Sequence, residues 1–139
     1  RTGFPEAAAR FGRHLGTAYQ IYDDLADFFG DQSRIGKTLG TDLASGKSTL
    51  PLLMLLERLP GAQADALRAE MIAGDTSNLP VRVAQMEKLN VFRDVLAELH
   101  DENRRGLAQL DPWSGSNPAR KLRELALLLE HQAKGLKTG

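Results

Sequence analysis

Residues 6–29 carry the pattern that most restricts the fold of this chain, because they describe one long amphipathic helix. Apolar side chains recur there at spacings of three, four and seven residues, which fit the period of an α-helix. The side chains that follow this period and would face a core are Phe11, Leu15, Tyr22, Ala26 and Phe29. The pattern therefore predicts a helix with one buried side.

The other side of the same helix is small, polar and acidic. Asp23 and Asp27 are four residues apart, so they differ by only about 40° around a helix and point the same way. Asp24 flanks the same stripe. Toward the N-terminus the stripe continues through small and polar residues, namely Gln20, Gly16 and Gly12. Since glycine costs a helix about 1 kcal/mol relative to alanine, the two glycines indicate that a ligand or another helix needs room on this side.

Three carboxylates on one stripe repel each other, and a bound cation would neutralise them. No histidine or cysteine lies nearby, so the oxygen ligands favour magnesium or calcium. Magnesium usually takes one or two carboxylates, keeps several waters and completes its shell with phosphate oxygens. The alternative is that Asp23, Asp24 and Asp27 are ordinary surface acids at a solvated helix end.

A glycine-rich loop follows this helix over residues 30–48 and brings up two lysines, Lys37 and Lys47. Gly46-Lys47-Ser48 imitates the end of a P-loop, but the full spacing and the preceding strand are missing. Two ammonium groups beside an acidic helix would compensate the charge of a bound phosphate as point charges. The alternative is that both lysines serve only solubility. Ser48 or Thr49 then caps the next helix.

The rest of the chain also follows the helical period. We expect further helices over residues 50–59, 62–73, 80–88, 91–110 and 118–134, with Asn117 as the cap of the last one. No segment alternates with the period of a strand over a useful length. The sequence therefore predicts an all-α fold, a helical bundle in which residues 1–139 form a single helical region.

Composition excludes several classes of function. Acidic and basic residues balance at 18 each, so nothing indicates a nucleic-acid partner. The longest apolar runs are too short to span a membrane, and no signal peptide is visible. The chain has no cysteine, which fits the cytoplasmic location that we expect. The three histidines are far apart and share no ligand spacing.

The stretch YQIYDDLADFFGDQSRIGKTLGTDLASGKSTLPLL resembles the second aspartate-rich region of the trans-isoprenyl diphosphate synthases, or polyprenyl synthetases. That family's pattern is an aromatic-Gln pair, DDxxD, GK, G-x-D and GK-x-T-x-P, and every element is present in order. The strong resemblance covers the first third of the chain. It implies the C-terminal part of the isoprenoid synthase fold. A class I terpene cyclase is also all-helical, but the paired GK loop fits the chain-elongating enzymes better.

The resemblance also implies roles for the charged residues. Asp23, with Asp24 and Asp27, would bind Mg²⁺ that bridges to an allylic diphosphate. Lys37 and Lys47 would contact the diphosphate oxygens. The implied reaction is a head-to-tail (1′-4) condensation in which the diphosphate leaves, isopentenyl diphosphate attacks the allylic cation and a proton is lost. Preplaced cations would stabilise the charge of the leaving group.

Two further residues gain a role from the resemblance. Tyr19 and Gln20 would lie beside the allylic carbon that develops positive charge. Their expected task is substrate binding next to the reacting carbon.

The chain departs from the family pattern in one large respect. The family has a first aspartate-rich motif on an earlier helix, whereas this sequence contains no second Asp-Asp pair. We therefore expect the C-terminal half of a longer enzyme, inactive alone, whose partner is the missing half, a second subunit or a further copy in a homo-oligomer. An exposed apolar patch on residues 50–59 and on the first helix should mark the missing partner. The alternatives are a non-catalytic subunit that modulates a full-length synthase and a plain helical interaction domain.

Overall fold

A computed structural model describes residues 3–30 and 39–136 of the chain. Its helices are α1 (Phe4–Phe29), α3 (Thr41–Ala44), α4 (Leu50–Arg58), α5 (Gly61–Ala73), α6 (Leu79–Lys88), α7 (Val91–Gln109), the 3₁₀ turn η1 (Asp111–Trp113) and α8 (Asn117–Lys134). The described residues contain no strand, so the prediction of an all-α fold is confirmed. None of these helices combines the length and apolar character needed to cross a membrane.

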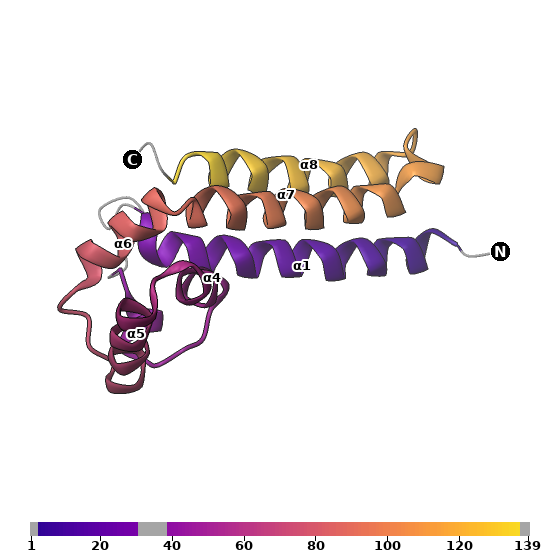
Figure 1. Ribbon diagram of the computed structural model, residues 1–139. Coiled ribbons are helices and arrows are strands. Elements are labelled where there is room, and N and C mark those ends of the chain that lie inside the picture. The colour runs from indigo at the N-terminus through magenta and orange to yellow at the C-terminus, as the bar shows by residue number, and fades with distance from the viewer. Residues whose placement is uncertain (1–2, 31–38, 137–139) are drawn as a thin grey trace.

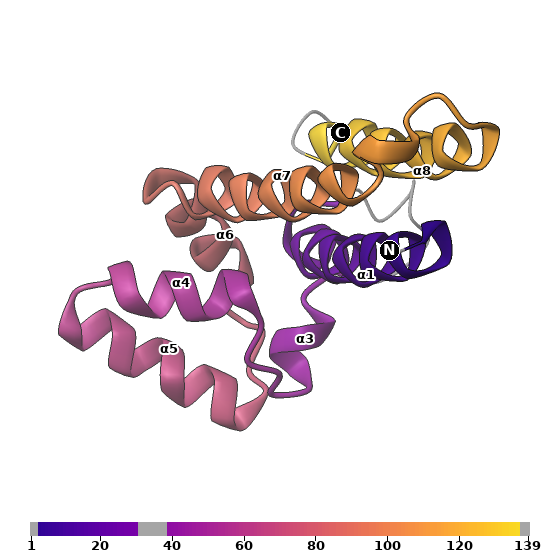
Figure 2. The same cartoon turned by 90° about the vertical axis from the view of Figure 1, so that its right-hand side faces the viewer.

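Three long helices, α1, α7 and α8, lie side by side with nearly parallel axes (Figure 1). α7 runs antiparallel to α1 and is its main neighbour, and α8 runs antiparallel to α7. The shorter helices α4, α5 and α6 gather near the end of this layer where α1 finishes (Figures 1 and 2). The acidic end of α1 therefore lies where the long and short helices meet.

Close packing joins α1 to α7. A Cβ atom added at Gly106 of α7 would lie only 3.0 Å from Cβ of His14 and 3.3 Å from Cδ1 of Phe11, so the two helices approach closely at this glycine. At the other end, the rings of Phe29 and Phe92 meet edge to face with centroids 4.7 Å apart. The side of α7 that faces α1 is buried at its centre, where Leu99 lies fully buried in the main core.

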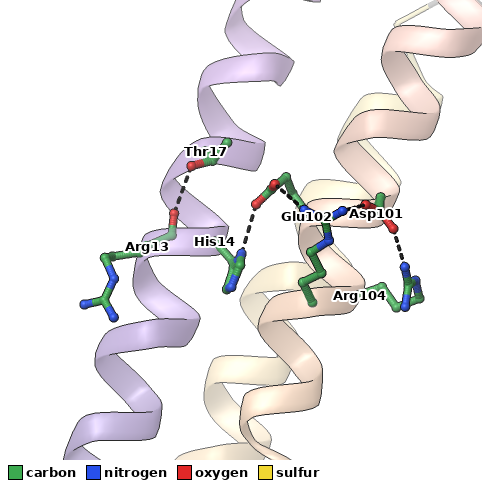
Figure 3. A network of polar contacts seen from close by, with 7 residues as sticks. Arg13, His14, Thr17, Asp101, Glu102 and Arg104 are labelled. Atoms are coloured by element: carbon green, nitrogen blue, oxygen red, sulfur yellow. Dashed lines mark hydrogen bonds and ion pairs between the residues drawn. The ribbon is translucent and has the colours of Figure 1, made fainter.

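A polar network runs along the edge of the same helix pair (Figure 3). Nδ1 of His14 lies 3.0 Å from Oε2 of Glu102. On α7, Arg105 lies 2.8 Å from Asp101 and 3.5 Å from Glu102, and Arg104 also pairs with Asp101. Of these contacts, that of His14 with Glu102 joins the two helices, whereas those of Arg104 and Arg105 lie within α7. His14 therefore serves helix packing as a partly buried side chain.

The last two turns of α1 differ from the prediction of a helix with one open polar side. Residues 24–29 are all buried, including Asp24 and Asp27. Residues 40–42 are hydrogen-bonded to this end of the helix, and Gly40 and Leu43 are buried as well. Helical periodicity records only local spacing, so it could not reveal that a loop covers the polar side.

Two caps also differ from the predictions. Ser116, and not Asn117, caps α8, because the Ser116 hydroxyl accepts a hydrogen bond from the Ala119 N–H at 3.3 Å. Thr49 stands at the N-cap position of α4, as predicted, but its side chain makes no capping hydrogen bond. Pro51 lies in the first turn of that helix and fits there, since a first-turn N–H has no intrahelical partner.

The exposed apolar side chains lie mostly away from the predicted place. Of the apolar patch predicted on residues 50–59, Leu53 is 44% exposed, whereas Leu52 and Leu55 are fully buried. The other large exposed apolar residues of the described chain lie on α5, α6 and α8, namely Ile72, Val81, Leu125, Leu127 and Leu128. None lies on α1, so that part of the prediction is wrong. The apolar side of α1 is covered by the two core clusters within this chain.

Candidate functional site

The candidate site begins where the chain returns to the end of α1 after residues 31–38. The Gly40 N–H donates a hydrogen bond of 2.7 Å to the main-chain oxygen of Asp27. Gly40 has φ of 77°, and a Cβ atom there would lie 2.7 Å from Cδ2 of Leu79. Only glycine takes this left-handed conformation in so tight a place without strain. The turn delivers α3 directly onto the acidic end of α1.

Both carboxylate oxygens of Asp27 accept hydrogen bonds from this returning segment. Its Oδ1 accepts hydrogen bonds from the Thr41 N–H at 3.0 Å and from the Thr41 hydroxyl at 2.8 Å. Its Oδ2 accepts a third from the Asp42 N–H at 2.9 Å. Asp27 is only 1% exposed. Each buried oxygen is therefore compensated by donors from the loop, as a buried carboxylate requires.

Asp24 is a buried carboxylate whose pKa depends on the charged residues of the loop. Burial raises the pKa of Asp24, whereas the hydrogen bond from Gln20 lowers it. The charges of Asp42 and Asp23 raise the same pKa, and the charge of Lys47 lowers it. These carboxylates and the ammonium group of Lys47 thus share one electrostatic neighbourhood. Asp23 itself is exposed.

Lys47 is held near this acidic group through the main chain. Its N–H donates a hydrogen bond of 2.9 Å to the main-chain oxygen of Asp42, and its Nζ lies 3.9 Å from Oδ1 of Asp42. The side chain of Lys47 remains 64% exposed, so its ammonium group is accessible to an anion. Lys37, the other predicted lysine, lies outside the described residues.

The two residues predicted to flank the substrate have different surroundings. Nε2 of Gln20 donates a hydrogen bond of 3.1 Å to Oδ1 of Asp24, so this amide orients the buried carboxylate. Tyr19 is partly buried and packs against the main core cluster. Both side chains come from the turn of α1 that precedes the aspartates.

The structure brings some of the predicted site residues together and separates others. The charges of Asp23 and Lys47 act on the pKa of Asp24, whereas the carboxylate of Asp27 accepts hydrogen bonds from Thr41 and Asp42. Within residues 3–30 and 39–136, no three carboxylate or histidine groups stand close enough together to hold a metal ion. Because the Asp27 carboxylate already accepts three hydrogen bonds, Asp23 and Asp24 remain as the two candidate metal ligands of this motif. That number suits magnesium, which commonly takes one or two carboxylates and fills its shell with water and phosphate.

Sequence reasoning missed the part played by Thr41 and Asp42. Asp42 is the aspartate of the G-x-D element, but nothing local in the sequence indicates that its N–H reaches Asp27, fifteen residues earlier. The available signal was the Gly-Thr-Asp order. A glycine that can turn the chain, followed by two residues typical of helix starts, predicts a short helix such as α3.

The described residues form an all-helical chain in which an acidic helix and a lysine-bearing loop meet. Comparison with known proteins assigns the chain to a family with this combination of motifs. The family model for polyprenyl synthetase matches residues 3–91, which include the whole of this helix and loop. The chain belongs to the polyprenyl synthetase family, and its described residues form an all-α part of the isoprenoid synthase fold.

Several relatives carry names of this family. The chain is 33% identical to the all-trans-nonaprenyl-diphosphate synthase (geranyl-diphosphate specific) of Rhodobacter capsulatus over 78% of this chain and 33% of that protein. It is 42% identical to the octaprenyl diphosphate synthase of Escherichia coli (strain K12) over 50% of the chain and 21% of that protein. A probable mitochondrial hexaprenyl pyrophosphate synthase of Yarrowia lipolytica is 31% identical over 96% of the chain and 29% of that protein. The chain thus spans about a third of the length of these relatives or less.

Proposed function

We propose that this chain is part of a prenyltransferase that binds an allylic diphosphate through Mg²⁺ for head-to-tail (1′-4) condensation with isopentenyl diphosphate. One observation carries the proposal. The accessible ammonium group of Lys47 lies 3.9 Å from Oδ1 of Asp42, and the N–H of Asp42 donates to the Asp27 carboxylate at the end of α1. The charges of Lys47 and Asp42 also act on the pKa of the buried Asp24. Acidic groups that attract a metal and a basic group that attracts an anion thus meet at one place, within the region that matches the family.

Asp23 and Asp24 are the residues that would hold magnesium. The oxygen atoms of carboxylates are the ligands that this metal prefers, and burial together with neighbouring acids already disfavours the free anion at Asp24. When bound, the metal would neutralise the diphosphate and stabilise the charge that it takes up as it leaves. Gln20 keeps the Asp24 carboxylate in place through its hydrogen bond.

Lys47 would contact the diphosphate oxygens as a point charge, and Lys37 would do the same from the earlier part of the loop. The exposure of the Lys47 side chain supports this role, because a lysine already buried in an ion pair would have no free donor to offer. Tyr19 and Gln20 would lie beside the reacting allylic carbon, one turn before the aspartates on α1.

The groups in this chain supply one side of such a site. The first aspartate-rich motif and the basic residues for isopentenyl diphosphate would come from another segment or another subunit, and we propose that the chain is inactive without them. A non-catalytic helical subunit that modulates a full-length synthase is the second candidate. The half-exposed leucines of α8, Leu125, Leu127 and Leu128, favour it because they offer a surface for a partner.

An activity assay separates the two candidates. The chain is expressed alone and together with the part of the E. coli octaprenyl diphosphate synthase that precedes the matched region, and incorporation of labelled isopentenyl diphosphate into prenyl products is measured. We expect product only from the pair, and its loss with Asp23→Asn but not with Asp65→Asn, an exposed acid on α5. Equal product from the Asp23→Asn variant would support the modulating subunit instead.

A further inference from the structure

Asp27 belongs to the acidic motif, yet its surroundings differ from those of a metal ligand. We propose that Asp27 is a positioning residue: together with Thr41 it forms a clamp, defined by these two residues, that fixes the loop carrying Lys47. This role rests on the proposed function, because the clamp is proposed to position Lys47 for binding a diphosphate. The clamp itself rests only on contacts within the described residues.

The carboxylate of Asp27 is already occupied. A carboxylate offers about four lone-pair positions, and three of them accept hydrogen bonds from Thr41 and Asp42 at 2.8 to 3.0 Å. The side chain is 1% exposed, so this loop covers it. Magnesium keeps several of its waters and needs an open carboxylate oxygen. A metal could reach Asp27 only after the loop had left it.

The clamp extends beyond the side chain. The main-chain oxygen of Asp27 accepts the Gly40 N–H at 2.7 Å, so both the main chain and the side chain of one residue hold three consecutive residues, 40–42. The left-handed conformation of Gly40 aims the next two N–H groups at the carboxylate. Two independent sets of hydrogen bonds thus determine where α3 begins.

From the clamp, the contacts lead to Lys47 in two steps. Asp42 donates its N–H to Asp27, and its main-chain oxygen accepts the Lys47 N–H at 2.9 Å. The side chain of Asp42 also faces Nζ of Lys47 at 3.9 Å. Because lysine carries four flexible carbon atoms, a fixed main chain limits the region that its ammonium group can reach. Asp27 therefore sets the position of an ammonium group that it does not touch.

Asp23 provides the internal comparison. It lies one helical turn before Asp27, but it is exposed, whereas Asp27 is buried beneath the loop. The two aspartates thus have different roles, because Asp23 is accessible to a metal whereas Asp27 holds the loop. Substitutions at these positions should have different signatures.

Hydrogen exchange tests the clamp without metal or ligand. Thr41→Val removes one donor and leaves the Asp27 carboxylate intact, Asp27→Asn keeps the shape of the side chain, and Thr41→Ser keeps the hydroxyl as the rescue. We expect exchange at the amides of residues 41, 42 and 47 to rise about tenfold or more in the first two variants and to stay near wild type in Thr41→Ser. The amide of Leu99, in the core of α7, reports global folding and should not change.

Titration with inorganic pyrophosphate and magnesium tests the positional role. Thr41→Val and Asp27→Asn should weaken binding about tenfold at saturating magnesium, with the magnesium concentration for half-saturation unchanged. Asp23→Asn should raise that concentration and leave exchange at the loop amides unchanged.

Two outcomes would overturn the clamp. One is unchanged exchange at residues 41, 42 and 47 in Asp27→Asn. The other is a shifted magnesium requirement in Asp27→Asn, equal to that of Asp23→Asn, combined with wild-type behaviour of Thr41→Val. A wild-type chain that binds no magnesium pyrophosphate would reject the proposed function instead, and the exchange measurement would still decide whether the clamp exists.

Discussion

Nζ of Lys47 lies 3.9 Å from Oδ1 of Asp42, while the side chain of Lys47 is 64% exposed and that of Asp42 only 15%. The Asp42 carboxylate is thus largely buried, whereas the Lys47 ammonium group extends into solvent. An exposed pair at this distance contributes little to stability, about 0–1 kcal/mol. The arrangement suits a lysine that exchanges one anionic partner for another.

Removal of the Lys47 ammonium group should therefore affect binding more than folding. We expect Lys47→Ala to weaken the affinity for magnesium pyrophosphate about tenfold, since a hydrogen bond to a charged group contributes roughly 1.5–3 kcal/mol. The melting temperature should stay within about two degrees of the wild type, because surface substitutions change stability by about 0.5 kcal/mol or less. Calorimetric titration measures the first quantity. Lys88→Ala, an exposed lysine on α6, is the control, and an equal loss there would contradict the assignment.

The buried ion pair between Arg82 and Glu70 should dominate the stability of the short helices. Nη2 and Nε of Arg82 donate to the Glu70 carboxylate at 2.5 and 2.9 Å, and the side chains are 5% and 8% exposed. Arg82→Met would leave Glu70 buried without its partner and should cost about 3–5 kcal/mol in the free energy of unfolding. Urea denaturation measures this cost.

The exposed pair of Arg68 and Asp65 on α5 provides the matched control, with side chains 57% and 78% exposed. Arg68→Met should cost less than about 1 kcal/mol. Similar costs for the two methionine substitutions would show that burial does not govern these ion pairs.

The same buried pair predicts a dependence of stability on pH. The hydrogen bond from Arg82 lowers the pKa of Glu70 below its ordinary value of 4.5. The contribution of Glu70 to stability is therefore complete above pH 4.5 and is lost as the pH falls from there through the lowered pKa of the folded state. Denaturation curves between pH 3 and pH 6 should show a flatter fall below pH 4.5 for Glu70→Gln than for the wild type. Parallel pH profiles for the two proteins would contradict this account.

Two glycine-to-alanine substitutions should have opposite effects. A Cβ atom at Gly106 would meet Cβ of His14 at 3.0 Å, whereas a Cβ atom at Gly16 would meet nothing within 4 Å. Gly106→Ala should destabilise the chain by about 1–3 kcal/mol through overpacking, and Gly16→Ala should stabilise it by up to about 1 kcal/mol through helix propensity. Thermal unfolding distinguishes them. A stabilising Gly106→Ala substitution would show that α1 and α7 do not pack as closely as described.

Much of the fold could be predicted from the sequence, because apolar residues at helical spacing form the side of each helix that is buried in the core. The predicted helix over residues 91–110 agrees with α7 to within one residue, and the central Val95 and Leu99 are buried. Helix ends that depend on a single side chain were less predictable. Ser116 and Asn117 are both good caps, and only the structure shows which hydroxyl or amide meets the free N–H group.

The candidate site was predictable in part. The order of aspartates, glycines and lysines indicated a meeting of acid and base, and Asp24 with Lys47 follows that expectation. The environment of Asp27 could not be read from the sequence, since periodicity places it on the same stripe as Asp23. Contacts with residues 40–42 bury one of these aspartates and leave the other exposed, and such contacts depend on the path of the chain between helices.

In the proposed function, the end of α1 and the loop carrying Lys47 together bind a magnesium-bound diphosphate. Calorimetric titration of inorganic pyrophosphate into the wild-type chain and into Asp23→Asn, with magnesium and with EDTA, measures this binding. Binding to the wild type should require magnesium and should be weakened at least tenfold in Asp23→Asn. Binding of equal strength in magnesium and in EDTA, unaffected by Asp23→Asn, would contradict the proposed function.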